Sequence, residues 1–164
     1  MAMHPVKSRM FLFSKLPAAY FSGVRIKELN EEKCVTTVPY RWFSKNPFRS
    51  TYFACLAMAA ELSTGALVMS NIFEKRPRVS MLIIDMDAEF FKKAVGLTTF
   101  VCQDGIAIRD AVDTAIATEE SNIICVKSIG TNEAGEPIAE FSFTWSFKIK
   151  SKKASKPVQN TGDE

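Results

Sequence analysis

The chain has 164 residues, long enough for one domain with a sizeable hydrophobic core. Hydrophobic residues make up 47% of it and charged residues 24%, which is typical of a globular domain and excludes a disordered chain. The net charge of +3 is too even to indicate nucleic-acid binding, so we expect no nucleic-acid partner.

Histidine is almost absent from the sequence. The single His4 near the N-terminus argues against a Ser-His-Asp triad, a Cys-His pair or a His-rich metal site. Any chemistry must therefore rely on carboxylates, hydroxyls, thiols or backbone dipoles, and we expect neither a metal nor a cofactor.

The cysteines and the apolar segments indicate a compartment. No C-x-x-C pair or zinc-ribbon spacing occurs, and apolar neighbours favour buried free thiols in a reducing environment. No stretch reaches the roughly 20 apolar residues needed to span a bilayer, and the run after Lys7 and Arg9 ends too early for a signal peptide. We therefore expect a cytoplasmic protein with no membrane partner; the cysteines are Cys34, Cys55, Cys102 and Cys125.

The first elements are predicted from short patterns. Residues 1–22 mix apolar and basic positions and are interpreted as a helical or irregular cover segment. Strand patterns follow at residues 24–26 and 34–38, separated by a polar turn. Residues 44–47 then form a loop with a helix-entry signal.

Residues 52–69 are predicted to form a helix, because Ala, Leu and Met dominate the segment. It is apolar on all sides except at Glu61, Ser63 and Thr64. A helix without a polar stripe must be enclosed on nearly every side. Gly65 is a candidate end of this helix.

The second half of the chain is mainly strand. Strands are predicted at residues 79–84, 97–102 and 122–129, and one helical face indicates a helix over 106–118. The last strand, 141–150, is the clearest, since its apolar side chains alternate with polar ones and so face a single covered side. These apolar residues are Phe141, Phe143, Trp145, Phe147 and Ile149.

Together these elements predict an α+β domain over residues 23–150, a curved antiparallel sheet wrapped around a central apolar helix. This is the hotdog fold, although the pattern alone also allows other α+β arrangements. The helix near 106–118 is an addition to the minimal hotdog plan. The polar tail, residues 151–164, is expected to be disordered.

Glu61 is the main candidate for chemistry. It is the only charged residue between Arg49 and Glu74 and lies inside the apolar helical segment. Enclosure would raise its pKa, as suits a general base, and Ser63 and Thr64 in the next turn could hydrogen-bond a substrate or water. The alternative is a structural carboxylate paired with a buried Arg.

The segment from Asn46 to Gly65 resembles the signature of hotdog thioesterases of the phenylacetate-degradation type. That signature has an Asn, a short loop, His-Gly-Gly, an apolar stretch, Leu-Ala-Asp or Leu-Ala-Glu, and a Gly four residues on. The chain is also similar to a bacterial group of hotdog proteins of unassigned function. The order of elements fits over about residues 20–150, whereas motif agreement is confined to residues 46–65.

The resemblance implies a site. Glu61 takes the place of the catalytic carboxylate, which activates water or attacks the thioester carbonyl. Asn46 matches the residue that positions substrate or water, and Gly65 matches a small residue that allows close helix packing. Tyr52 replaces the family's His. Phe53, followed by Ala54, stands where a Gly lends its backbone N–H to the thioester oxygen.

The implied function is hydrolysis of an acyl-CoA or a related thioester by a homodimer or dimer of dimers, with the site at the subunit interface. A second hypothesis is a non-catalytic acyl-CoA or fatty-acyl binding module, favoured by the bulky Tyr52 and Phe53. A third is a structural role for Glu61. Basic residues that could contact CoA phosphates also suit a solvated surface: Lys75, Arg76, Arg78, Lys92 and Lys93.

Overall fold

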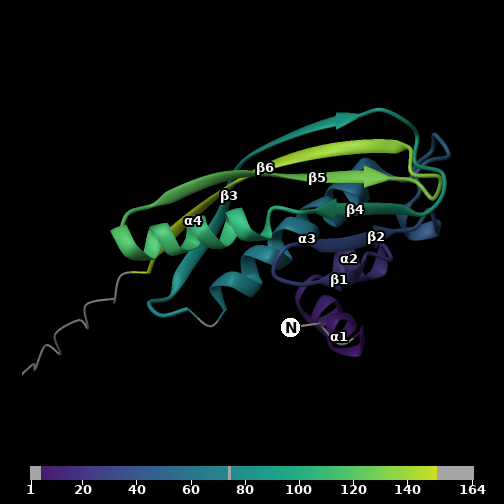
Figure 1. The fold of residues 1–164 in the computed structure, drawn as a ribbon. Coiled ribbons are helices and arrows are strands. Elements are labelled where there is room, and N and C mark those ends of the chain that lie inside the picture. Colours follow the sequence, from purple (N-terminus) through teal and green to yellow (C-terminus); the bar gives the residue numbers. More distant parts are fainter. Residues whose placement is uncertain (1–4, 74, 151–164) are drawn as a thin grey trace, which may run out of the picture.

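The computed structural model describes residues 5–73 and 75–150, which form one curved sheet and its helices (Figure 1). His4 and the predicted tail, 151–164, lie outside these residues. The elements are α1 (Pro5–Lys15), α2 (Pro17–Phe21), β1 (Arg25–Leu29), β2 (Cys34–Val38), η1 (Trp42–Ser44), α3 (Phe53–Ile72), β3 (Val79–Phe90), β4 (Thr98–Cys102), α4 (Gly105–Thr118), β5 (Asn122–Thr131) and β6 (Pro137–Ile149).

The sheet has six strands in the order β1-β2-β4-β5-β6-β3, and every neighbouring pair is antiparallel. Its two edges are therefore β1 and β3. The longest pairing joins β3 to β6, from Val79 opposite Ile149 to Phe90 opposite Ala139, with a bulge between Ile83 and Asp85. The α+β architecture predicted from the sequence, a curved sheet around a central helix, is confirmed.

The central helix α3 lies against the concave side of the sheet and packs on β2, β4, β5 and α4 (Figure 1). Two buried hydrogen bonds attach it: the Thr36 hydroxyl donates to the Ala59 carbonyl over 2.7 Å, and the Ser63 and Ser128 hydroxyls lie 2.7 Å apart. The helix continues past Gly65 to Ile72, so the expectation that Gly65 ends it is wrong. Gly65 has no positive φ that would break the helix.

The length and composition of α3 contradict the expectation that no segment is apolar enough to span a bilayer. With 20 residues and a mean hydropathy of 1.5, it is long and apolar enough to cross a bilayer, contrary to the expectation from the sequence. In this fold it is the core helix, and 11 of its residues are buried. Its apolar character follows from enclosure by the sheet.

Strand β6 supplies the aromatic side of the core. Phe141, Phe143, Trp145 and Phe147 are all buried, as the alternation predicts. The rings of Phe141 and Phe143 stack with centroids 6.0 Å apart. Fully burying a side chain of this size stabilises the fold by about 1.5–3 kcal/mol, so this face is a major source of stability.

Three of the four cysteines are buried and free, as expected: Cys34, Cys55 and Cys102. Cys125 is free but exposed, which corrects the expectation that all four are buried. It lies on β5 between the half-buried Ile124 and the buried Val126, so its side chain faces the outer side of the sheet.

The N-terminal helices cover the β1 edge. The helix α1 packs on β1 and α2, and the Cys55 thiol lies 3.7 Å from the Ser22 hydroxyl, which connects the end of α2 to α3. This agrees with the interpretation of residues 1–22 as a cover segment. Where the domain begins and ends remains a prediction.

The helix α4 is held against the β1–β2 turn by a close approach at Gly105. Its N–H donates to the Glu32 carbonyl over 2.9 Å, and a Cβ at residue 105 would lie 2.2 Å from the Glu31 carbonyl oxygen. Only glycine fits there without moving backbone.

Gly105→Ala is therefore expected to lower the free energy of unfolding by about 2 kcal/mol or more, because backbone must shift to admit the methyl group. Urea denaturation measures the change. Gly96→Ala is the matched control, since its added Cβ meets only the flexible end of Glu133 at 3.2 Å. Equal effects at the two positions would contradict the packing argument.

Candidate functional site

The N-terminus of α3 presents free backbone donors. Tyr52 is the N-cap residue, with extended backbone and no side-chain cap. The N–H groups of Cys55 and Leu56 both donate to the Tyr52 carbonyl, over 2.9 and 3.3 Å. Within the described residues this leaves the N–H groups of Phe53 and Ala54 without a backbone acceptor. They point along the positive end of the helix dipole, where they can stabilise negative charge.

Asn46 organises the loop before this helix. Its side-chain oxygen accepts from the N–H groups of Phe48 and Ser50 over 2.9 and 3.2 Å. Its amide nitrogen donates to the Ser50 hydroxyl over 3.1 Å, and its backbone N–H donates to the Ser50 carbonyl over 2.9 Å. The loop is closed further by a bridge between Lys45 and Thr51. In this structure Asn46 therefore shapes the loop that leads into α3.

An open pocket of about 630 Å³ lies at this helix terminus. Three predicted site residues, Asn46, Tyr52 and Phe53, line it. The rings of Tyr52 and Phe53 pack edge to face with centroids 5.0 Å apart, and 46% and 56% of the two residues are exposed. The opposite wall comes from the end of β3 and the segment after it, Phe90 to Ala94.

Thr51 lines the same pocket and was missed by the sequence analysis. The residue is 3% exposed, and its hydroxyl is the only buried side-chain polar atom of the described residues without a hydrogen-bond partner. Burying an unsatisfied hydroxyl costs about 1–3 kcal/mol. No pattern in the sequence marks Thr51, because its burial depends on the loop closure around Asn46.

Glu61 lies two turns further along α3. Its side chain is half-buried, and desolvation by burial raises the pKa of its carboxyl above the ordinary value of 4.5. Among the described residues, no Arg or Lys forms an ion pair with this carboxylate, and no side chain donates a hydrogen bond to it. The pairing with an Arg that a structural role would require is not found. Within the described residues the carboxylate is therefore unpaired.

Gly65 lies against this carboxylate, and Thr64 and Trp145 are neighbours in the same part of the structure. A Cβ at Gly65 would lie 2.8 Å from Oε1 of Glu61 and 3.6 Å from the Trp145 ring, so the glycine makes room for the carboxylate. The Trp145 indole N–H donates to the Thr64 hydroxyl over 3.2 Å, and that hydroxyl donates to the Glu61 carbonyl over 3.0 Å. The resemblance implies close packing at Gly65, and in the structure the group packed against Gly65 is the carboxylate of Glu61.

The predicted site residues thus form two groups in one chain. Asn46, Tyr52, Phe53 and Ala54 gather at the helix N-terminus, whereas Glu61, Thr64 and Gly65 lie beside Trp145. From Phe53 to Glu61 the helix rises about 12 Å at 1.5 Å per residue. Neither of the two pockets described here is lined by Glu61. Within one chain, the Glu61 carboxylate and the free N–H groups of Phe53 and Ala54 are therefore too far apart to act on the same group.

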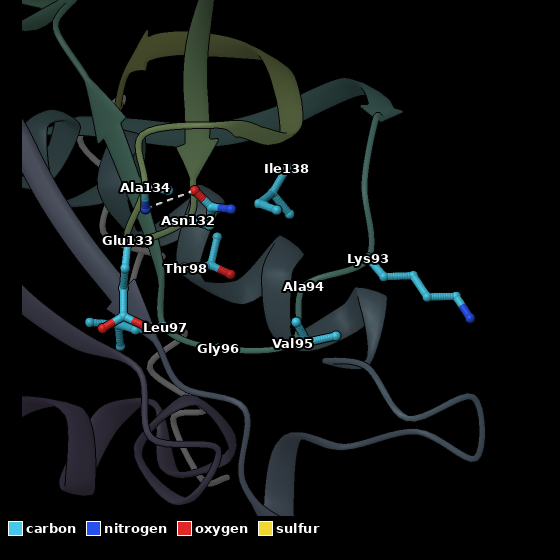
Figure 2. Close-up of a pocket in the computed structure, with 10 residues that line it drawn as sticks. All are labelled: Lys93, Ala94, Val95, Gly96, Leu97, Thr98, Asn132, Glu133, Ala134 and Ile138. Atoms are coloured by element: carbon cyan, nitrogen blue, oxygen red, sulfur yellow. Dashed lines mark hydrogen bonds between the residues drawn. The ribbon is translucent and has the colours of Figure 1, made fainter.

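A second pocket, of about 330 Å³, lies between the β3–β4 connection and the β5–β6 turn. Figure 2 shows the Asn132 side chain and the N–H of Ala134 joined by a hydrogen bond of 3.0 Å at its rim. It shares Lys93 and Ala94 with the first pocket, but the Lys93 side chain extends away from the other lining residues (Figure 2). Lys93 is thus a basic side chain near the N-terminus of α3.

The other basic candidates are placed less favourably. Lys92 pairs with Glu136 over 2.7 Å, and Lys75 pairs with Asp113. Lys75, Arg76 and Arg78 follow the C-terminus of α3, about 30 Å from its N-terminus by helix rise. No three metal-binding side chains of the types His, Cys, Asp and Glu gather in the part of the chain that the structure describes.

The family model of DUF4442, a domain of unknown function, matches residues 7–147. The chain belongs to this family. The match spans α1 to β6 and includes both groups of site residues. No protein with a curated description matches the sequence.

Solved structures with the same fold include thioesterases. PA5026 from Pseudomonas aeruginosa, a protein of unknown function and probable thioesterase, is 22% identical with a TM-score of 0.78, over 92% of this chain and 99% of its own. The thioesterase HI1161 from Haemophilus influenzae is 10% identical with a TM-score of 0.66, over 94% and 97%. PaaI of the E. coli phenylacetic acid degradation operon is 12% identical with a TM-score of 0.60, over 89% and 94%. At these identities the likeness establishes the hotdog fold for this member of the DUF4442 family.

Glu61→Gln is expected to raise the free energy of unfolding at pH 7 and to leave it unchanged near pH 4. The pKa of Glu61 is raised from 4.5 in the folded state, so just above that pH the folded chain binds more protons than the unfolded one. Wild-type stability therefore falls with rising pH relative to the variant, until the folded carboxyl is also ionised.

Urea unfolding of both proteins from pH 4 to 8 measures this difference. Glu120→Gln, at an exposed position, reports the effect of the amide alone. If Glu61 instead stabilised the fold increasingly as the pH rises, the carboxylate would have a favourable partner, and the desolvation argument would fail.

Proposed function

We propose that this DUF4442 protein hydrolyses an acyl-CoA or a related thioester, with Glu61 as general base or nucleophile. The observation that carries the proposal is an unpaired, half-buried carboxylate whose pKa is raised by desolvation, on a helix whose N-terminus presents free N–H groups. Such a carboxylate holds a proton more readily near neutral pH than an exposed one, which suits a general base. The thioesterases of the same fold support the choice of substrate class.

The reaction can be written through these groups. As general base, Glu61 takes a proton from water while the water oxygen bonds to the thioester carbonyl carbon and the carbonyl electron pair moves onto oxygen. The intermediate then expels sulfur, the C–S bond breaks, and the proton passes from Glu61 to the thiolate. The products are a carboxylic acid and a thiol. As nucleophile, a carboxylate oxygen of Glu61 would bond to the carbonyl carbon while the C–S bond breaks and the thiolate leaves. Water would then hydrolyse the mixed anhydride to the carboxylic acid and free Glu61, and a proton from that water would pass to the thiolate.

Negative charge on the carbonyl oxygen needs donors, which the first turn of α3 supplies. The N–H groups of Phe53 and Ala54 point at the pocket end of the helix and need no reorganisation to meet an oxyanion. The Phe53 and Tyr52 side chains bound the entrance and would limit the acyl groups that fit.

The separation along α3 requires a second copy of the chain. Because about 12 Å of helix divides Glu61 from the N–H donors, both can reach one carbonyl only if they come from different copies. The β3 edge is suited to pairing, since it is long and carries the exposed apolar residues Leu82, Ile84, Met86 and Phe90. We infer a homodimer with a shared site.

The alternative function is acyl-CoA or fatty-acyl binding without turnover. Tyr52 and Phe53 favour it, because the thioesterases that the motif resembles have His-Gly at these positions and therefore more room. This alternative predicts saturable binding and a higher Tm with ligand, but no release of thiol.

Glu61→Gln is expected to lower kcat/KM for thioester hydrolysis at least about 100-fold, because the amide cannot accept the proton. Thiol release from short, medium, long and aromatic acyl-CoAs measures kcat/KM. The acyl chain that is hydrolysed best indicates the size of the pocket. Turnover that survives the substitution would exclude Glu61 as base or nucleophile. Ligand binding without turnover in the wild type would instead identify a binding module.

Phe53→Pro tests the backbone donor. Proline removes the N–H at the first helical position, where it is well tolerated, and the extended backbone of Tyr52 suits the residue before proline. We expect kcat to fall about 100-fold, as for loss of an oxyanion donor. Phe53→Ala keeps the N–H and is the matched control; equal losses would assign the effect to the side chain.

Mixing the two inactive variants tests the shared site. After subunit exchange, half of the dimers are mixed, and each mixed dimer has one site with both wild-type groups. Activity should recover to about a quarter of wild type if the groups come from different copies. Mixtures that remain inactive after proven exchange would place the site within one copy or leave Glu61 with a structural role.

A further inference from the structure

An exposed apolar surface lies on α1, α2 and η1, and none of its residues belongs to the proposed site. We call it the aromatic patch and define it by Met10, Phe13, Phe21, Trp42 and Phe43. Their exposed fractions run from 52% for Phe21 to 71% for Trp42. These residues come from α1, α2 and η1, and Figure 1 shows α1 and α2 beside β1.

The patch is continuous, although its residues are far apart in the sequence. The ring centroids of Phe13 and Phe21 are 6.3 Å apart, those of Phe21 and Phe43 6.1 Å, and those of Trp42 and Phe43 4.8 Å. Aromatic rings from three elements thus form one chain of contacts on the surface.

The patch stands on a well-packed base. On the inner side of α1, Leu12 is fully buried, and Ala19 of α2 is 5% exposed. The outer side of α1 carries Met10 and Phe13, at positions where a surface helix usually has polar residues. The inner face of α1 already makes its contacts with the core. The exposed rings on its outer face are therefore not needed to hold α1 in place.

The segments that form the patch carry basic residues and no acidic ones. Residues 5–27 and 33–60 hold no Asp or Glu. Seven basic side chains of these segments are exposed and form no ion pair with any residue that the structure describes: Lys7, Arg9, Lys15, Lys27, Arg41, Lys45 and Arg49. The 18 acidic residues of the chain all lie in other segments.

This charge distribution selects the occupant. A second copy bound through the same patch would place the basic residues of both copies face to face with no acid between them, which is unfavourable. A neutral partner would make no favourable electrostatic contact with these basic residues. Exposed Trp, Phe and Met surrounded by Lys and Arg are the combination that inserts apolar side chains at a lipid interface while cations contact anionic headgroups.

We propose that the aromatic patch docks on the surface of an anionic phospholipid bilayer, with Phe13, Phe21, Trp42 and Phe43 at the acyl boundary and the basic residues on the headgroups. This replaces the expectation from the sequence that no membrane takes part. That expectation considered spanning segments and signal peptides, whereas the patch forms only when α1, α2 and η1 meet in space. The proposal does not depend on thioesterase activity.

Sedimentation of the full chain with vesicles tests the proposal. We expect at least about tenfold stronger binding to phosphatidylcholine vesicles with about 30% phosphatidylserine than to phosphatidylcholine alone, and loss of binding as salt screens the charges. Trp42 is 71% exposed and Trp145 3%, and they are the two tryptophans of the chain. A blue shift of emission on vesicle binding should therefore be absent from Trp42→Phe.

Matched variants separate the two contributions. Lys7→Glu with Lys15→Glu should weaken binding at least about tenfold, whereas Lys148→Glu with Lys150→Glu, also exposed, should not. Phe13→Ser should weaken binding, whereas Ile123→Ser, with a similar exposed fraction of 55% against 57%, should not. Circular dichroism confirms that each variant is folded.

Several results would overturn the proposal. One is absence of wild-type binding to anionic vesicles at low salt, which requires no variant. Others are equal binding to neutral vesicles, or binding unaffected by the Lys7 and Lys15 changes in folded protein. Self-association abolished by Phe13→Ser would assign the patch to a second copy. Binding to poly-glutamate but not to vesicles would assign it to an acidic protein.

Discussion

The enclosure of α3 by the curved sheet is the constraint on which the rest of the structure depends. A 20-residue apolar helix can be covered on most sides only if strands wrap around it, and the aromatic face of β6 fills the space between them. Two of the polar contacts in this interior attach the helix to the sheet, those of Thr36 with Ala59 and of Ser63 with Ser128. Within the described part of the helix, Glu61 is the one Asp, Glu, Lys or Arg that interrupts the apolar surface, and its side chain is only half-buried.

The same enclosure raises the pKa of Glu61 and lowers the stability of the fold when this carboxyl is ionised. A side chain at residue 65 would collide with the Glu61 carboxylate, so the glycine leaves room for it beside Trp145. Burial then raises the pKa of Glu61 because the charged form loses hydration that no protein donor replaces. A fold selected for stability alone would pair or remove this carboxylate. Its retention in an unpaired state is the physical reason why we propose Glu61 as the functional residue.

The sequence predicts those features that depend on local periodicity. The alternation in β6 and the composition of α3 indicated the sheet, the central helix and the enclosed Glu61 correctly. Features created by contacts between distant segments could not be predicted. The orphaned hydroxyl of Thr51 depends on a loop shaped by Asn46, and the full length of β3 was missed because a bulge after Ile83 interrupts its alternation. The exposure of Cys125 follows from which face of β5 the core uses.

The proposed dimer and the proposed membrane contact use different edges of the sheet. Because β1 and β3 are opposite edges, pairing of two copies through β3 leaves the aromatic patch beside β1 free on each copy. A dimer would then carry two patches, and a second patch that reaches the same bilayer binds at a high effective concentration, so two weak contacts give firm attachment. This gain requires both patches to face one side. The curvature of the sheet, which enclosure of α3 imposes, therefore decides whether dimer formation strengthens membrane binding or leaves each patch to act alone.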